Sequence, residues 1–301
     1  METALQNQLT PCPICKASAR HLFVKDGYRI ARCPSCSTLF VQNPPDDTSF
    51  VYDENYFFGG ERGGGYGSYD DEKEVMRGTF EKCLDLILKH GAKGSLFDVG
   101  AATGYFLSLA RERGFRGAGV DISAAAAREA QKKGLAVEAG TLQTVPHPPT
   151  LYDAVTLFDV LEHVPQPGKL ISSAVSLLRD GGIIMGSTPD SMSINARLFG
   201  RYWHMLFPPE HLVLLNDKSL RLILERAGCE VIWTGRITKR FSIPYILQTA
   251  SRWIRFPALS RLGNAIRGTW MSRVGIPLDL RDNLFFLARK TRAPFSHTGE
   301  L

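Results

Sequence analysis

Short apolar runs alternate with amphipathic stretches along most of this chain, in the order expected of a parallel α/β sheet. The helix-like stretches carry apolar residues three and four positions apart and stop at glycines such as Gly91, Gly114 and Gly228. The predicted helices are 72–90, 105–113, 123–133, 170–178 and 220–227, and the predicted strands are 95–99, 116–121, 135–142, 151–163, 181–188, 230–233 and 283–288. Strands that alternate with helices favour an α/β fold whose ligands bind beyond the carboxyl ends of the strands.

A different pattern precedes this alternation. Two Cys-x-x-Cys pairs, Cys12/Cys15 and Cys33/Cys36, have the spacing of a four-thiolate zinc site. The residues between them, 21–32, read as a strand, an Asp-Gly turn and a second strand. Four thiolates leave no open position on the ion, so we expect a structural Zn²⁺ in an N-terminal zinc ribbon over residues 1–43.

The ribbon is followed by a linker, which we place at 44–71. It opens on paired prolines and then mixes bulky aromatic residues with a glycine run. Such a segment is a loop pinned to the body by its aromatics or a lid over the active site, and the combination of hinge freedom with apolar bulk favours the lid. The main domain is then 72–291, with a tail over 292–301.

The central feature of the main domain is the strand and turn over 95–106. The turn reads Asp98-x-Gly100-x-Ala102-x-Gly104, and the next strand ends in Asp121 about twenty residues later, an offset suited to an acid that binds ribose hydroxyls. The acid within the turn would repel phosphate, which argues against a dinucleotide. A further strand ends in polar residues near Asp159.

These segments, in this order, resemble the motifs of class I S-adenosylmethionine-dependent methyltransferases, whose fold is a Rossmann-like sheet of seven strands with the last strand antiparallel. The resemblance covers roughly 72–290. It implies that S-adenosylmethionine is the cofactor, that Asp121 binds its ribose, and that Thr141 stands where the family often places the adenine contact. The implied cofactor-binding residues are Asp98, Gly100, Ala102, Gly104, Asp121, Ile122, Thr141, Leu142 and Asp159.

Methyl transfer needs alignment of the reactants, plus a base when the acceptor must lose a proton. His163 directly follows the fourth strand, and Glu210 and His211 lie in a loop stiffened by two prolines. The layout resembles bacterial methyltransferases with an N-terminal zinc ribbon, among them deoxysugar C-methyltransferases that carry a Glu-His pair after the fifth strand. We expect His211 or His163 to act as the base; a helix-capping or packing role is the alternative for each.

The charge pattern and the absence of targeting segments indicate where the protein acts and what it contacts. The chain has 301 residues and a net charge of +6, and no stretch has the pattern of a signal peptide or membrane span, so we expect a cytoplasmic protein. Between Glu230 and Asp279 there is no acid but there are eight arginines and lysines, and most of this segment is a basic helical insert over about 241–278. The insert is a substrate cap or dimer element, or it contacts a membrane surface. The oligomeric state is open.

The preferred function is methylation of a small molecule such as a sugar, a glycan precursor or another secondary metabolite. An RNA methyltransferase is a second candidate because basic charge favours phosphate, although the ribbon lacks interleaved aromatic and arginine residues for stacking bases. A non-catalytic scaffold is a third candidate. Retention of both Asp98 and Asp121 argues against it.

Overall fold

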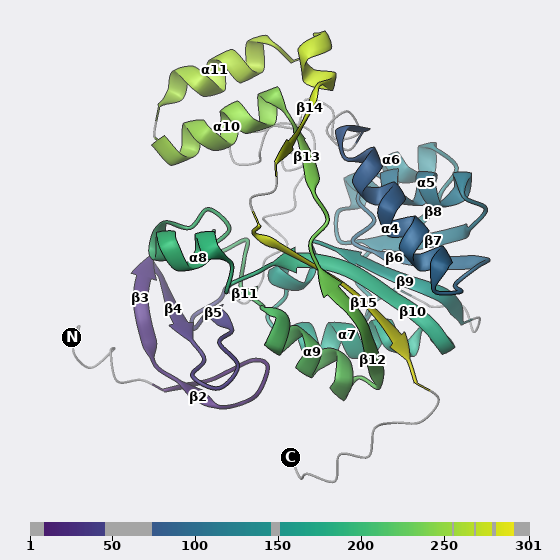
Figure 1. Cartoon of the computed structure of the whole chain (residues 1–301), viewed down its shortest axis with the longest axis horizontal. Helices are drawn as coiled ribbons and strands as arrows, with labels where there is room; N and C mark the ends of the chain where they lie inside the picture. Colours follow the sequence, from purple (N-terminus) through teal and green to yellow (C-terminus); the bar gives the residue numbers. More distant parts are fainter. Residues whose placement is uncertain are drawn as a thin grey trace.

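The computed structural model of this chain describes residues 9–45, 74–145, 151–254, 256–267, 269–278 and 281–291. Its main body is a sheet covered by helices on both faces, with a small β unit on one side and a helical hairpin on another (Figure 1). The strands of the main sheet are β6 (Ser95–Val99), β7 (Arg116–Asp121), β8 (Ala136–Ala139), β9 (Tyr152–Phe158), β10 (Leu178–Pro189), β12 (Cys229–Gly235) and β15 (Asn283–Lys290). The helices of the body are α4 (Arg77–Lys89), α5 (Tyr105–Glu112), α6 (Ala124–Lys132), α7 (Pro167–Ser176), α8 (Ile194–Phe199) and α9 (Asp217–Arg226), with short 3₁₀ turns η2 (Leu161–His163) and η3 (Gly200–Tyr202).

The seven strands lie in the order β12-β15-β10-β9-β6-β7-β8. β15 is antiparallel to both of its neighbours, whereas β6, β7, β8, β9 and β10 pair in parallel. The expected α/β fold, with its seven strands and antiparallel last strand, is therefore confirmed. The chain runs outward from β6 to β8 and then returns to β9 on the other side of β6. Ligands of open α/β sheets bind at such a reversal, so we expect the site at the carboxyl ends of β6 and β9.

Both faces of the sheet are buried, so its strands read as nearly continuous apolar runs. Leu96 and Ala154 point to the face covered by α4, α5 and α6, whereas Phe97 and Val155, the next residues along, point to the face covered by α7 and α9. This alternation is the period of two expected of strands. The two faces therefore bury separate sets of helices, α4, α5 and α6 on one side and α7 and α9 on the other.

Several boundaries differ from those predicted. The strand expected over 135–142 occupies only Ala136–Ala139, because Gly140 turns the chain with a φ of 144°. The helix expected over 170–178 begins at Pro167 and ends at Ser176, and Leu178 already belongs to β10. Leucine suits a helix and a buried strand equally well, so the sequence alone could not place this border.

The N-terminal unit is built from short strands. β1 (Thr10–Pro11) pairs with β2 (Ser18–Ala19), and a second sheet has the order β11-β5-β4-β3. Its members are β3 (His21–Lys25), β4 (Tyr28–Arg32), β5 (Leu39–Val41) and β11 (Val213–Leu214). Because β11 belongs to the main domain, the β unit is not an independent appendage: one of its sheets is completed by a strand from far along the sequence.

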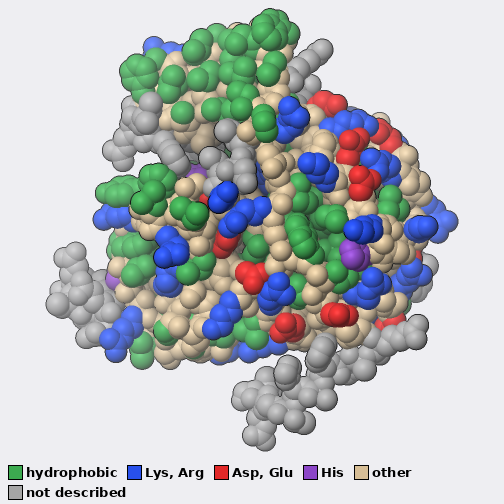
Figure 2. Space-filling view, in the orientation of Figure 1, with side chains coloured by type: hydrophobic (Ala, Val, Ile, Leu, Met, Phe, Trp, Pro, Cys, Tyr) green, Lys and Arg blue, Asp and Glu red, His purple; other side chains and the backbone are tan. Residues whose placement is uncertain are grey.

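The basic insert is a hairpin that carries helices. β13 (Lys239–Ser242) pairs with β14 (Gly275–Leu278), and between them lie α10 (Ile243–Ile254), α11 (Pro257–Ala265) and the turn η4 (Trp270–Arg273). In Figure 1 this hairpin stands away from the sheet, and in Figure 2 its visible face is largely apolar. No helix among the described residues is long and apolar enough to span a membrane. The predicted lid over 44–71 lies, after its first two residues, outside the described part of the chain, as does the tail from residue 292.

Candidate functional site

The turn after β6 has the backbone geometry that its small residues predict. Gly100, Ala102 and Gly104 have φ values of 75°, 49° and 76°, a region that side chains disfavour. The space beside two of them is filled by protein. A Cβ on Gly100 would lie 2.5 Å from Val160 Cγ2, and one on Gly104 would overlap the side chain of Leu135. Packing of the turn on its neighbours therefore demands these glycines, whatever ligand the turn holds.

The two acids of the motif lie at the carboxyl ends of adjacent strands. Asp98 is 3% exposed and accepts a hydrogen bond of 2.6 Å from the hydroxyl of Thr156 on β9. Asp121 is 6% exposed, and its two oxygens accept the backbone N–H groups of Ala102 at 2.7 Å and Ser123 at 2.8 Å. Burial raises the pKa of Asp121 above its ordinary value. Each of its oxygens keeps a second lone pair, which suits a pair of ribose hydroxyls.

Residues expected near adenine lie beside Asp121. The N–H of Gly140 donates to the carbonyl of Asp121 at 2.8 Å, which draws the turn with Thr141 and Leu142 to the end of β7. Leu142 is buried, and Ile122 exposes 44% of its surface. The structure therefore brings Ile122, Leu142 and Thr141 to one edge of the sheet, with an apolar side chain available to a ligand.

Asp159 has a partner that the sequence did not reveal. It takes a φ of 55° directly after β9, and its carboxylate accepts hydrogen bonds of 2.7 Å from Ser187 and from Lys239. Lys239, at the start of the insert, is only 8% exposed. In the sequence this lysine belongs to the acid-free segment between Glu230 and Asp279, yet its charge is paired at the sheet edge with Asp159, whose side chain is 35% exposed. It lies 80 residues from Asp159, and no local pattern links the two.

The candidate catalytic histidines form a cluster with Glu162. The ring of His163 packs edge-on against that of His211, with centroids 4.9 Å apart, and His163 Nε2 lies 3.9 Å from a carboxylate oxygen of Glu162. Glu162 itself is 1% exposed and accepts a hydrogen bond from the Thr188 hydroxyl. Sequence reasoning passed over Glu162 as a functional residue, although its position beside His163 was the available signal.

Burial governs the protonation of this cluster. It raises the pKa of Glu162 to about 8, with a further contribution from the nearby charge of Asp159. It lowers the pKa of His163, and it lowers that of His211 to about 3, where the neighbouring ring of His163 adds to the effect. Both rings are therefore neutral at physiological pH. Glu210, the third candidate, meets the cluster through its backbone carbonyl, which accepts from His163 Nδ1 at 2.9 Å.

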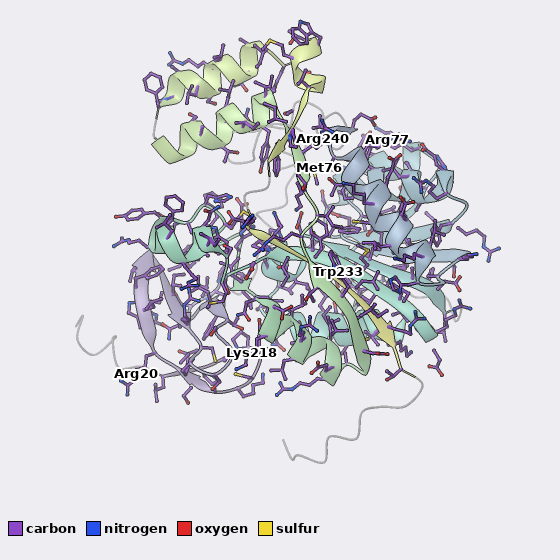
Figure 3. All side chains as sticks on the ribbon, viewed as in Figure 1. Arg20, Met76, Arg77, Lys218, Trp233 and Arg240 are labelled. Carbon is purple, nitrogen blue, oxygen red and sulfur yellow. The ribbon has the colours of Figure 1, made fainter. Side chains whose placement is uncertain are left out.

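The loop that ends in His211 is held by the N-terminal β unit. The N–H of Val41 in β5 donates to the carbonyl of Leu212, and the N–H of Leu212 donates to the carbonyl of Glu162. Beyond β11, Asn216 donates through Nδ2 to the carbonyl of Cys36 at 3.0 Å. Lys218, labelled in Figure 3, donates to the carbonyl of Ser35 at 2.7 Å. A series of hydrogen bonds thus connects the β unit to the histidine cluster.

The four predicted zinc ligands come together. Cys12, Cys15, Cys33 and Cys36 are free thiols, and their sulfurs all lie within 4.8 Å of one another. The pairs Cys12–Cys36 and Cys15–Cys33 have S–S distances of 3.5 and 3.4 Å. Tetrahedral Zn²⁺ with bonds of about 2.3 Å holds its sulfurs about 3.8 Å apart, so this donor set fits the ion with small adjustments.

Comparison with known proteins identifies the family. The family described as "Methyltransferase domain" matches residues 72–233. A probable S-adenosylmethionine-dependent methyltransferase of Mycolicibacterium smegmatis is 29% identical over 48% of this chain and 55% of its own. A ubiquinone biosynthesis O-methyltransferase of Albidiferax ferrireducens is 29% identical over 31% of this chain and 40% of its own.

This chain thus spans about half the length of these curated relatives. Magnesium protoporphyrin IX methyltransferase from Synechocystis PCC 6803, solved with bound SAH, has a TM-score of 0.51 and 16% identity over 81% of this chain and 100% of that one. At that identity the likeness concerns the fold alone.

Proposed function

This chain belongs to the class I S-adenosylmethionine-dependent methyltransferases, and from that premise we propose that it methylates a small-molecule acceptor such as a sugar, a glycan precursor or another secondary metabolite. The observation that carries the proposal is the cluster of Glu162, His163 and His211. It is a largely buried polar group at the carboxyl edge of the sheet, beside the strand that follows the cofactor motifs. A buried cluster suits an acceptor small enough to enter a pocket.

The cofactor is proposed to lie across the ends of β6 and β7. Asp121 would accept the ribose hydroxyls, with Ile122, Thr141 and Leu142 around the adenine. The turn from Asp98 through Gly100, Ala102 and Gly104 would pass beneath the amino acid part of the cofactor, and Asp159 would border its methyl end. S-adenosylmethionine supplies the methyl group as an electrophile, so the protein has to align the acceptor and deal with the acceptor's proton.

His211, His163 and Glu210 are the proposed catalytic residues. The neutral imidazoles offer lone pairs at physiological pH, and the carbonyl of Glu210 orients His163 through Nδ1. Fixing the tautomer in this way leaves Nε2 as the basic nitrogen of the ring. A pair of rings held edge-on by separate segments keeps the same orientation from one turnover to the next.

Two observations weigh against RNA as the acceptor. The ribbon pairs with β11 of its own chain instead of presenting a separate platform, and the charge of Lys239, in the acid-free segment, is neutralised by Asp159. The ubiquinone biosynthesis relatives, by their names, act on a small molecule, which is support by similarity for the same class of acceptor here.

We assign the remaining parts by the same reasoning. Residues 1–43 form the zinc ribbon, with Zn²⁺ on Cys12, Cys15, Cys33 and Cys36 as a structural ion that supports β5, its partner β11 and the histidine loop. The segment 44–71 is the proposed linker or lid, 72–291 the methyltransferase domain, about 241–278 its insert and 292–301 the tail.

For the insert we propose peripheral contact with an anionic membrane surface. Its described residues expose Phe256, Leu262 and Trp270 by 54%, 51% and 75%, and the segment between Glu230 and Asp279 contains no acid. Exposed apolar side chains with basic neighbours are the composition of a surface-bound amphipathic helix.

The test is methyl transfer from S-adenosylmethionine labelled on its methyl group. The protein is offered pooled small-molecule acceptors, with nucleotide-linked sugars first, and in parallel total RNA from which the small molecules have been removed. We expect label in the small-molecule fraction. His211→Ala should reduce the rate about 10²–10⁴-fold, the range for loss of a group that manages a proton, while His90→Ala should not. Label confined to RNA would refute the small-molecule proposal.

A further inference from the structure

Glu162, His163 and His211 have the geometry of a ligand set as well as that of a packed polar cluster. Each offers one ligand atom, and the three atoms lie within 4.8 Å of one another. Two come from the 3₁₀ turn η2 after β9, and the third from the loop before β11. Donors at about 2.1 Å from a tetrahedral ion are about 3.4 Å apart. The 3.9 Å between His163 Nε2 and the Glu162 carboxylate is therefore closed by a small side-chain rotation.

Each of these side chains is also oriented by a second protein group. His163 Nδ1 meets the carbonyl of Glu210, and His211 Nδ1 meets the carbonyl of Met205. A carbonyl only accepts, so each Nδ1 carries the proton, and Nε2 is the nitrogen through which each ring would bind a cation; the ring of His163 also has a hydrogen bond with the backbone of Asp159. The other oxygen of Glu162 is held by the Thr188 hydroxyl. Imidazoles whose far nitrogen donates to a backbone carbonyl, with a hydrogen-bonded carboxylate beside them, are the usual support of metal ligands.

We propose that Glu162, His163 and His211 bind one divalent cation at the acceptor end of the site. Two imidazole nitrogens and one carboxylate oxygen suit Zn²⁺, Mn²⁺ or Fe²⁺, and they leave open positions for an acceptor oxygen. A cation at this point would replace the hydrogen bond between the ring of His163 and the backbone of Asp159. The site is chemically distinct from the four-thiolate cluster. Four thiolates leave no open position on the ion, and they favour softer metal ions than a site with nitrogen and oxygen ligands does.

The inference deepens the proposed function and rests on it only for the cation's role, since binding of the cation is independent of any acceptor. When the cation is bound, both imidazoles are ligands, so water takes the acceptor's proton in place of a histidine base. A hydroxyl oxygen on the cation loses its proton more readily, because the positive charge stabilises the alkoxide or phenolate. That oxygen then attacks the methyl carbon of the sulfonium. A C–O bond forms, the C–S bond breaks, and the electron pair stays on sulfur as a neutral thioether. The acceptor class is therefore one that presents a hydroxyl or phenol.

The test uses the full chain with its ribbon loaded with zinc, and Mn²⁺ as the probe. Mn²⁺ prefers nitrogen and oxygen ligands to thiolates, so it does not displace zinc from the cysteines. The electron paramagnetic resonance signal of free Mn²⁺ falls as the ion binds, which gives affinity and stoichiometry. We expect about one Mn²⁺ per chain, and at least a tenfold loss of affinity in both His211→Ala and Glu162→Gln. His90→Ala, on a histidine outside the cluster, should bind as the wild type does.

Binding of S-adenosylhomocysteine, measured on the same samples, shows which variants are folded and separates the two proposals. Absence of Mn²⁺ binding in wild-type protein that binds S-adenosylhomocysteine would overturn the cation site and leave the methyltransferase function standing. Equal Mn²⁺ affinity in the wild type and in either folded variant would also overturn it. If Glu162→Gln does not fold, His211→Ala carries the comparison, with His211→Gln as a second substitution at the same position.

Discussion

Replacing the carboxylate of Asp121 with an amide tests the proposed ribose contact while almost preserving the shape of the side chain. In Asp121→Asn one oxygen is kept and the other becomes an NH₂ group. One of the backbone donors, the N–H of Ala102 or that of Ser123, then faces another donor instead of an acceptor. The side chain is 6% exposed, so water cannot substitute. An unsatisfied buried donor costs about 1–3 kcal/mol of unfolding free energy.

Cofactor affinity should fall by a separate amount. The ribose loses at least one hydrogen bond to a charged acceptor, which contributes about 1.5–3 kcal/mol. At 1.4 kcal/mol for each factor of ten, the Kd for S-adenosylhomocysteine should rise about 10–150-fold.

Urea denaturation gives the loss of unfolding free energy, and isothermal titration calorimetry gives the Kd for S-adenosylhomocysteine. The matched control is Glu138→Gln, the same chemical change on an exposed residue of the adjacent strand β8, for which we expect neither effect. A Kd within threefold of the wild type in a folded Asp121→Asn protein would refute the ribose assignment, whatever happens to its stability.

Three further changes test Asp121, the ribbon and the insert. Because burial raises the pKa of Asp121, affinity for S-adenosylhomocysteine should be full at neutral pH and decline on acidification earlier than an ordinary aspartate would allow; calorimetry across pH should show this decline in the wild type and not in Asp121→Asn. Asn216→Asp keeps the oxygen that caps α9 but removes the donor to the carbonyl of Cys36, so we expect about 1–3 kcal/mol lower stability and faster zinc release to a chelator; unchanged release would contradict the link. Trp270→Ser should weaken sedimentation with anionic vesicles, whereas Leu22→Ser, at an exposed apolar position on the ribbon, should not.

Much of the architecture was predictable because it is encoded locally. The strand periodicity, the glycines that stop helices and the offset between Asp98 and Asp121 predicted the α/β class and the number of strands. The pairing of Cys12/Cys15 with Cys33/Cys36 predicted the thiol cluster. Each of these signals depends on residues within one turn, one strand or one connection, where backbone geometry restricts which residue types can stand.

The glycine turn shows where a correct prediction had an incomplete reason. Gly100 and Gly104 belong to the predicted cofactor turn, and the structure shows that Val160 and Leu135 occupy the space beside them. A missing side chain in the sequence does not say which neighbour needs the room. The sequence likewise could not predict that β10 begins at Leu178, since an apolar residue packs equally well from a helix or a strand.

The chain by itself determined its class of fold, its thiol cluster and its position among the methyltransferases, since these follow from short-range patterns of residue type and spacing. Tertiary structure alone decided that Lys239 neutralises Asp159, that Glu162 faces His163 and His211, and that β11 completes a sheet of the ribbon. These contacts join residues far apart in sequence. They form because the buried faces of separate elements must satisfy their charges and backbone donors against one another, and no local pattern records which partner each will meet.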